Sequence, residues 1–429
     1  MIANLSYTSY YCNYNIFYLT SQLAFYYLTF FCNMLVYITI FIGGFYMGYG
    51  WSVSDLRDSL LKLERIINNT KNIEDEFYYK KVYGYTLKLL DRFVTNAKPY
   101  RKPNNDEKVQ DLLDDFYINR HWYSLVEEVY KRVECVDVFS YDATHAIEKV
   151  YGDGKNFVFN SSFHFPHDRT ISMVDDFYRG FDSELHDYFR EIYDRRYKAF
   201  DFIKNEGKDE ISECFLIDGP KDFFINIVDY KGVGKYSATV HECGHVIEFL
   251  MNSRMCYDDN PNYFTEVASI FPELVALYEG SLTNKDEYLY QFFCSLVTVL
   301  DDMANLIDHE LLVSSYIDND YRINNDYFKS LRSNYDLSKK DFNEAVEVKI
   351  GQAGTYITSL GVALELLHIY KQDKKRALEL FKKILMVQDN SNINANIMAL
   401  VPYGDGIEKE LSIFKDEFSL VLDRKGVKL

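Results

Sequence analysis

Two histidines four positions apart are the residues best suited to chemistry in this chain. His241 and His245 belong to the run His-Glu-Cys-Gly-His, and positions i and i+4 of a helix share one face. Their imidazoles can therefore bind a single cation. Glu242 projects about 100° around the helix from His241, where a general base for metal-activated water would lie. The spacing predicts a catalytic site with one zinc ion per chain.

A catalytic zinc site needs a third ligand, and two acids downstream are candidates. Glu266 is embedded in the apolar run 262–271, where an acid is otherwise unexplained. Glu273 lies seven residues later on the same helical face, so it is either a rival ligand or a hydrogen-bonding partner of a ligand. Pro272 removes a backbone donor between them, and a new helical segment could begin at Glu273. We predict Glu266 as the third ligand, with a fourth position left open for water or substrate.

The alternative to a metal site is a solvated helix that carries two histidines by chance. The residues that flank the motif, 237–240 and 246–251, make this helix apolar nearly all round, which predicts that it is buried. Buried histidines and acids need partners, and a shared cation supplies them. Gly244 lowers helix propensity by about 1 kcal/mol relative to alanine, which indicates that another part of the chain approaches the backbone there.

The runs His-Glu-Cys-Gly-His (241–245) and Thr-Glu-Val-Ala-Ser (265–269) resemble two elements of the oligoendopeptidase F branch of the thimet-type oligopeptidases. That family consists of gluzincin-type zinc metallopeptidases whose third ligand is a glutamate on the following helix. The resemblance covers residues from roughly 210 to 385. It implies a mainly α, zincin-like helical oligopeptidase fold with a small β-sheet beside the zinc helix. It also implies Glu242 as base and proton shuttle, with three zinc ligands: His241, His245 and Glu266.

The family also uses a histidine and one or two tyrosines from its C-terminal region to bind the oxyanion. Tyr356 stands near the first tyrosine of the family's Y-x-Y-x-x-G pattern, whereas Thr358 replaces the second. No histidine lies between His309 and His368, so the oxyanion histidine has no counterpart. Since one oxyanion donor is typically worth about 10²–10³ in turnover, weak activity is expected unless another donor substitutes. Glu248 replaces the family's usual histidine or serine on the ligand-bearing face of the helix.

Composition limits the classes of partner. The chain has 429 residues, 48% of them apolar, and can bury a large core. A formal charge of -18 without a Lys/Arg cluster argues against nucleic acid and anionic membrane surfaces, and makes a neutral or mildly basic short peptide the easier substrate. Seven scattered cysteines without a C-x-x-C pair predict reduced thiols and hence a cytosolic catalytic portion.

The N-terminal segment has a different composition from the rest. Residues 1–54 contain no Asp, Glu, Lys or Arg, and the hydrophobic stretch 16–51 is long enough for a transmembrane helix of about 20 residues. Basic residues follow this segment and none precedes it, which favours a cytoplasmic enzyme domain. We therefore predict a single-pass membrane anchor (1–53), a helical N-terminal region (54–205) and a catalytic region (206–429). If translation begins later, for instance at Met47, the protein would instead be soluble and cytoplasmic.

The elements expected to position the site are mainly helical. Residues 214–217 and 223–230, joined by an Asp-Gly-Pro turn, predict a hairpin whose strand could pair with an extended substrate peptide. Residues 231–234 then form the loop into the zinc helix. Helical patterns predict further helices: one that begins near Ser54, and others at 107–133, 174–203, 285–316, 341–370 and 373–388.

Three functional hypotheses follow from the sequence. The first is a zinc-dependent metalloendopeptidase that hydrolyses short peptides, with Glu242 as general base and Tyr356 as oxyanion donor. The second is a catalytically weak or inactive zinc- or peptide-binding membrane protein with the same fold. The third is a structural membrane protein that carries the motif by chance. Metal analysis combined with a peptide-cleavage assay distinguishes the three.

Overall fold

The computed structural model describes residues 53–96, 165–204, 211–217, 221–252, 263–297, 352–387 and 393–427, with isolated positions in 125–147 and at 299. The chain divides into two units, residues 1–59 and 60–429. The described part of the first unit is the beginning of helix α2 (Val53–Asn69). All described residues from Leu60 onwards belong to the second unit.

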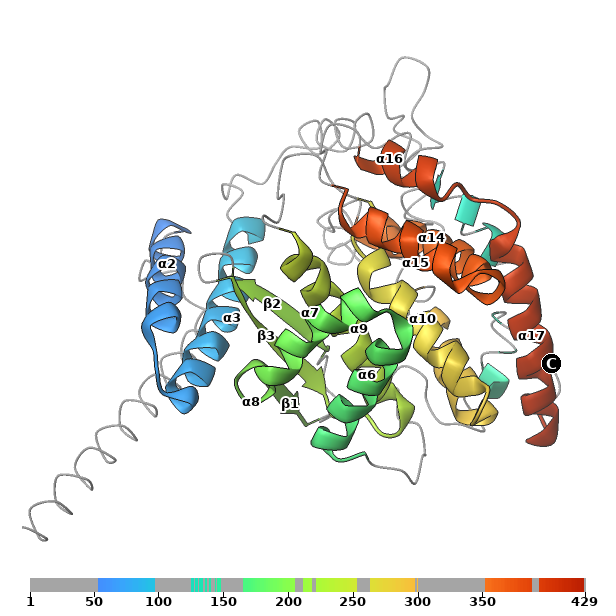
Figure 1. The fold of residues 1–429 in the computed structure, drawn as a ribbon, viewed down its shortest axis with the longest axis horizontal. Coiled ribbons are helices and arrows are strands. Elements are labelled where there is room, and N and C mark those ends of the chain that lie inside the picture. The colour runs from blue at the N-terminus through green and yellow to red at the C-terminus, as the bar shows by residue number, and fades with distance from the viewer. Residues whose placement is uncertain are drawn as a thin grey trace, which may run out of the picture. The chain divides into compact units, whose positions relative to one another are not determined.

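Helices dominate the second unit, and one small sheet accompanies them (Figure 1). The prediction of a mainly α fold with a small β-sheet beside the His-Glu-Cys-Gly-His helix is confirmed. Labelled as in Figure 1, the elements after α2 are α3 (Ile73–Asn96), α6 (His167–Phe181), α7 (Ser183–Asp194), α8 (Arg196–Ala199), β1 (Phe200–Ile203), β2 (Glu213–Ile217), β3 (Asp222–Val228), α9 (Val233–Met251), α10 (Val267–Ser281), α14 (Gln352–Gln372), α15 (Lys374–Leu385), α16 (Ile393–Leu400) and α17 (Gly406–Arg424).

The sheet has the strand order β1-β3-β2, and its central strand β3 is buried along its whole length. β2 and β3 form the predicted antiparallel hairpin, with Phe215 opposite Phe224. Side chains of a strand alternate between two faces. Phe224 packs edge-on against Phe77 of α3, with ring centroids 5.3 Å apart, whereas Ile225 joins the core that contains the apolar residues of α9. Helices α3 and α9 therefore cover opposite faces of the sheet.

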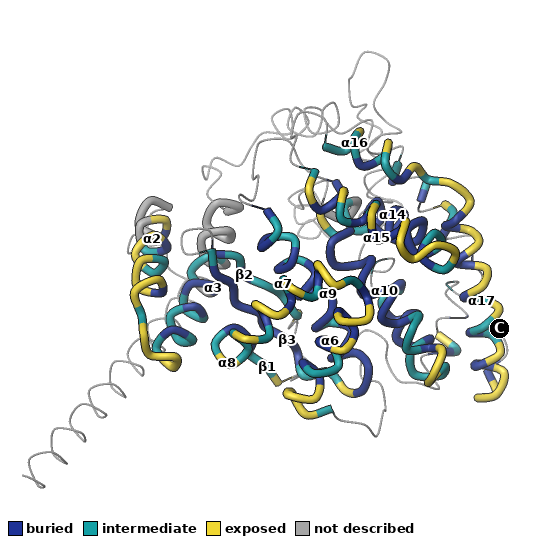
Figure 2. The backbone as a smooth tube through the Cα atoms, viewed as in Figure 1, coloured by how far each residue is buried: buried dark blue, intermediate teal, exposed yellow. Residues whose placement is uncertain are grey.

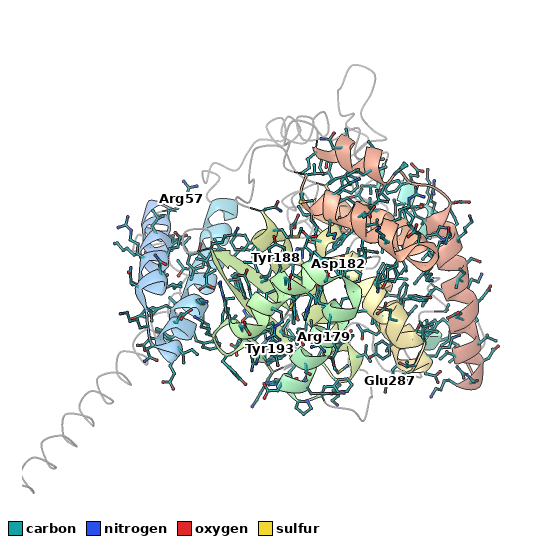
Figure 3. All side chains as sticks on the ribbon, in the orientation of Figure 1. Arg57, Arg179, Asp182, Tyr188, Tyr193 and Glu287 are labelled. Atoms are coloured by element: carbon teal, nitrogen blue, oxygen red, sulfur yellow. The ribbon has the colours of Figure 1, made fainter. Side chains whose placement is uncertain are left out.

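The single helix expected at 174–203 is instead three helices and a strand. The first break occurs at Asp182 (Figure 3). This residue has an extended backbone and caps α7 by accepting hydrogen bonds from the backbone N–H groups of Glu184 (2.9 Å) and Leu185 (3.1 Å). The prediction is also wrong at Phe200–Ile203, which form β1 and pair in parallel with β3. Pairing between residues distant in sequence outweighs the local helical pattern there.

Helices α9 and α10 form the centre of the unit, and the tube in Figure 2 is mostly dark blue along both. Every residue from Val267 to Leu277 in α10 is buried. The chain enters α9 through Gly232, whose φ of 60° lies in the left-handed region that glycine adopts without a steric penalty. The predicted loop at 231–234 is accordingly shorter than expected, since α9 already begins at Val233.

Helix α10 continues through Pro272 without interruption, so the expectation that a new helix begins at Glu273 is wrong. Proline lacks the N–H group that would bond to the carbonyl four residues earlier, here that of Ala268. This carbonyl lies against α9 at Gly244, where an added Cβ atom would overlap it. The Ala268 carbonyl, which lies at the contact between α9 and α10, therefore receives no helical hydrogen bond from residue 272.

Several predictions fall outside the described residues. Nearly all of the predicted anchor, residues 1–52, lies there, as do most of 107–133 and the second part of 285–316, whose first part is helical to residue 297. Among the helices that the structure does describe, none has both the length and the apolar character required to cross a bilayer. The sheet combines strands from both sides of the boundary predicted at 205/206; the three-part division of the chain stays a prediction.

Candidate metal centre

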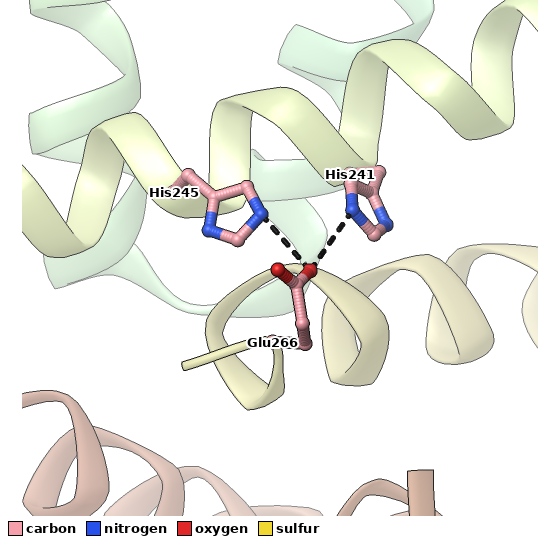
Figure 4. Close-up of side chains that lie close together, drawn as sticks. All are labelled: His241, His245 and Glu266. Atoms are coloured by element: carbon pink, nitrogen blue, oxygen red, sulfur yellow. Dashed lines mark ion pairs between the residues drawn. The ribbon is translucent and has the colours of Figure 1, made fainter. Parts of the chain in front are cut away.

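His241 and His245 project from α9 towards Glu266, which stands at the N-terminus of α10 (Figure 4). Their Nε2 atoms lie 3.4 Å and 3.2 Å from the same carboxylate oxygen, Oε2 of Glu266. When a tetrahedral zinc ion has bonds of about 2.0–2.1 Å to nitrogen and oxygen, neighbouring ligand atoms are about 3.3 Å apart. Both distances match this value. The kinds of donor atom and these two distances therefore fit a zinc ion, and the three donor atoms all lie within 4.8 Å of one another.

Glu273 lies on the other side of the His241 ring. Its Oε2 is 2.9 Å from Nδ1 of His241, and its Oε1 accepts hydrogen bonds from Ser237 (2.5 Å) and Ser295 (2.8 Å). Because Glu273 is bonded to Nδ1, the imidazole directs Nε2 towards Glu266. An acid in this place orients a metal-binding histidine and increases its basicity. Glu273 thus contacts the ring nitrogen of His241 opposite to the one that faces Glu266, as a hydrogen-bonding partner of a ligand would.

We expect Glu273→Gln to weaken zinc binding by about 10- to 100-fold, the usual effect of removing a partner of a metal-binding histidine. The amide would place an NH₂ group against the serine hydroxyls or the imidazole, and the negative charge would be lost. A competition titration with a chromophoric chelator measures this change. Glu379→Gln, at an exposed carboxylate of α15, is the control. An unchanged zinc affinity would show that His241 does not depend on Glu273 for its orientation.

Charge complementarity within the cluster is strong. Burial acts to raise the pKa of Glu266, but the neighbouring imidazoles of His245 and His241 outweigh it and hold the pKa well below its usual range. For His241 burial acts in the opposite direction and would lower the pKa, because it disfavours the charged imidazole. The hydrogen bonds of His241 with Glu266 and Glu273 outweigh this effect and raise its pKa above the ordinary value. The acids around them thus raise the pKa of both His241 and His245, and a metal ion would compete with protons for the same ring nitrogens.

Glu242 is 6% exposed and belongs to α9, which packs against β2 and β3. Burial raises the pKa of its carboxyl group above the ordinary value, and the positive imidazoles beside it oppose this effect. The thiol of Cys214, on β2, faces the carboxylate of Glu242. The sequence predicted Cys214 only as a reduced thiol. The pairing of β2 with β3 under α9 brings it to the site, a contact that no local motif indicates.

Tyr356 reaches the same site from α14, more than 100 residues after His245 in the sequence. Its phenol faces the carboxylate of Glu266. Burial and the negative charges of Glu266 and Glu242 raise the pKa of Tyr356 well above its ordinary value, so the phenol keeps its proton at neutral pH. Thr358 is fully buried and donates a hydrogen bond of 2.5 Å to the carbonyl of Tyr263. It therefore does not act as a second oxyanion donor.

Glu248 lies one turn beyond His245 and is half-buried. Burial, together with the nearby charge of Glu266, raises its pKa to about 7, while His245 acts in the opposite direction. In its unprotonated form Glu248 therefore adds a negative charge beside the cluster.

The sequence has no histidine between His309 and His368. Of these two residues, His309 is outside the described residues. His368 is bonded to Glu410 of α17 through Nδ1 (2.9 Å).

No family model and no curated protein matches the sequence. Three solved structures resemble the fold. PZ peptidase A with an inhibitor has a TM-score of 0.47 at 15% identity, over 86% of this chain and 68% of that one. A protein described as an oligoendopeptidase F, from Bacillus anthracis str. Ames, gives 0.47 at 13% identity over 87% and 74%. Another so described gives 0.44 at 14% over 87% and 67%.

The fold of the chain is similar to those of two proteins described as oligoendopeptidase F.

Proposed function

We propose that this protein is a zinc-dependent metalloendopeptidase that hydrolyses peptide bonds in short peptides. The observation that supports this proposal is the position of one Glu266 oxygen, 3.4 Å and 3.2 Å from the Nε2 atoms of His241 and His245. A buried acid, Glu242, follows the first of these histidines directly. Two imidazoles and one carboxylate are the ligand set of catalytic zinc in peptidases of this type.

In this proposal His241, His245 and Glu266 would hold the zinc ion. When bound, zinc polarises the scissile carbonyl and makes water more acidic. Glu242 accepts a proton from the attacking water and then delivers it to the nitrogen of the leaving amine, which restores the carboxylate. Its raised pKa supports this role, because a base with a higher proton affinity removes the proton from water more readily.

Tyr356 would donate its phenolic proton in a hydrogen bond to the oxygen that becomes negative in the transition state. The raised pKa of this phenol keeps the donor protonated. The peptide itself would lie extended beside β2, which is an edge strand next to α9 and can extend the sheet through main-chain hydrogen bonds. Glu248 and the formal charge of -18 favour neutral or basic peptides.

Metal analysis and peptide cleavage together test the proposal. The purified protein should contain one zinc ion per chain and cleave a library of internally quenched peptides. A chelator should abolish cleavage, and added zinc should restore it. A protein that binds no zinc and cleaves no peptide in the library would contradict the proposal.

A second candidate is a zinc- or peptide-binding protein with little or no activity. Thr358 supports it, because this residue replaces an expected oxyanion donor and its hydroxyl is bonded to the Tyr263 carbonyl. The same assay separates the two functions. Stoichiometric zinc and measurable peptide binding without cleavage would favour this second candidate.

We further propose that residues 1–53 anchor the protein in a membrane with the catalytic region on the cytoplasmic side. The uncharged hydrophobic composition of residues 1–54 and the basic residues that follow support this arrangement. Translation from a later methionine would instead give a protein without this segment.

A further inference from the structure

Helix α14 contacts the segment that leads into α10 at two neighbouring positions. The hydroxyl of Thr358, which is fully buried, donates to the backbone carbonyl of Tyr263 at 2.5 Å. Two residues earlier on α14, the phenol of Tyr356 faces the carboxylate of Glu266, three residues after Tyr263. One turn of α14 therefore contacts both the main chain and the ligand side chain of the turn Tyr263–Glu266.

The other polar backbone group of Tyr263 is held by a second C-terminal helix. Its N–H donates to Oδ1 of Asn394, on α16, at 3.0 Å. The helical hydrogen bonds of α10 begin only after this residue, with Val267 bonded to the carbonyl of Phe264 and Ile270 to that of Glu266. Since Tyr263 precedes those bonds, side chains from α14 and α16 hold its backbone in place.

Thr358 is itself held through its backbone carbonyl. The hydroxyl of Tyr403, in the loop between α16 and α17, donates to the carbonyl of Thr358 at 2.9 Å. The Tyr403 ring also packs against Gly361, where an added Cβ atom would lie 2.8 Å from a ring carbon. Tyr403 and the packing of α14 thus set the position of Thr358 independently of the turn that it contacts.

We propose that Thr358 is a positioning residue, whose hydroxyl keeps the turn that carries Glu266 in register with Tyr356 on α14. The third metal ligand and the oxyanion donor then hold a fixed relation, although 90 residues separate them in sequence. This inference rests on the proposed function for the roles of Glu266 and Tyr356. It gives the threonine that replaces the family's second tyrosine a task of its own.

The experiment compares Thr358→Val, which has nearly the same shape but no hydroxyl, with Thr358→Ser, which keeps the hydroxyl. Thr170→Val is the matched control, because Thr170 is also fully buried and donates to a backbone carbonyl, that of Pro166, in α6. Asn394→Ala removes the acceptor of the Tyr263 N–H, and Asn394 is less buried than Thr358. The readouts are zinc affinity and hydrogen exchange of the amides of residues 264–270 in the metal-free protein.

We expect Thr358→Val to weaken zinc binding about tenfold and to speed exchange of the amides at 264–270. Asn394→Ala should shift both readouts in the same direction. Thr358→Ser should stay close to the wild type. Thr170→Val should lower thermal stability while leaving zinc affinity and exchange at 264–270 unchanged.

The proposal is overturned if Thr358→Val and Asn394→Ala both leave zinc affinity and exchange at 264–270 unchanged and, like Thr170→Val, only lower thermal stability. The exchange measurement requires neither zinc nor turnover. If the wild type binds no zinc, the proposed function fails, while exchange at 264–270 still decides whether Thr358 holds the turn. If the wild type binds zinc without cleaving peptides, both readouts apply in full.

Discussion

Replacing Glu242 with glutamine is expected to abolish peptide cleavage and to leave zinc bound. The glutamine side chain has nearly the same shape, but it cannot take a proton from water or pass one to the leaving amine. Positioned acid–base groups contribute about 10²–10⁴-fold to rate, so turnover should fall by at least this range. Zinc content should not change, because the three donor atoms that cluster belong to His241, His245 and Glu266. Cleavage of a quenched peptide and metal analysis of the same preparation measure both outcomes.

Stability separates this effect from unfolding. Burial raises the pKa of Glu242, which means that the buried site disfavours the charged carboxylate. Glutamine carries no charge, so Glu242→Gln should melt at the same temperature as the wild type or slightly higher. Glu379→Gln, at a side chain that is 57% exposed, is the control and should retain full turnover. Retained turnover in Glu242→Gln would refute its role as the base.

The pairing of His241 and His245 could be predicted because, in a helix, the spacing of two residues in sequence fixes the direction of one side chain relative to the other. Four residues place His241 and His245 on one face, and the structure brings both to Glu266. The hairpin of β2 and β3 was predictable for a related reason, since its turn residues and apolar runs are contiguous in sequence. These features depend on neighbours within a few residues.

The sequence predicted Glu266 as the third ligand because it is an acid within an apolar run, but spacing alone did not assign the roles of Glu266 and Glu273. Both acids approach His241, but from opposite ring nitrogens, Nε2 and Nδ1. Seven residues put the two acids on one helical face, and the spacing cannot say which of them faces the metal position. What decides between them is how α9 lies along α10, and the hydroxyls of Ser237 and Ser295 that are bonded to Glu273.

Contacts between distant segments account for the other differences. Cys214, Thr358 and Tyr403 stand in no motif with the residues they contact, and only the packed fold brings them together. Strand β1 forms because β3 offers it a partner, although its own sequence continued a helical pattern. In each case tertiary contacts outweigh or supplement the local preference. A single sequence does not display these contacts.

The contact between α9 and α10 predicts the effect of Gly244→Ala, which should destabilise the protein and weaken zinc binding. A Cβ atom on Gly244 would overlap the carbonyl oxygen of Ala268 and lie 2.8 Å from Cα of Ser269. Both are backbone atoms, so a side-chain rotation cannot relieve the clash and the helices must separate. Overpacking of this kind costs about 1–3 kcal/mol, against about 1 kcal/mol that alanine gains in helix propensity.

Separation of the helices would move Glu266 away from both imidazoles, because it stands two residues before Ala268 at the start of α10. Zinc affinity should therefore fall by more than the stability of the metal-free protein alone accounts for. Gly180→Ala is the matched control, since Gly180 lies in α6 with nothing within 4 Å of an added Cβ atom. That variant should be as stable as the wild type or up to about 1 kcal/mol more stable. Thermal melts with and without zinc distinguish the two variants. If Gly244→Ala instead matched Gly180→Ala in both, the two helices would not need glycine to bring the acid within reach of the histidines.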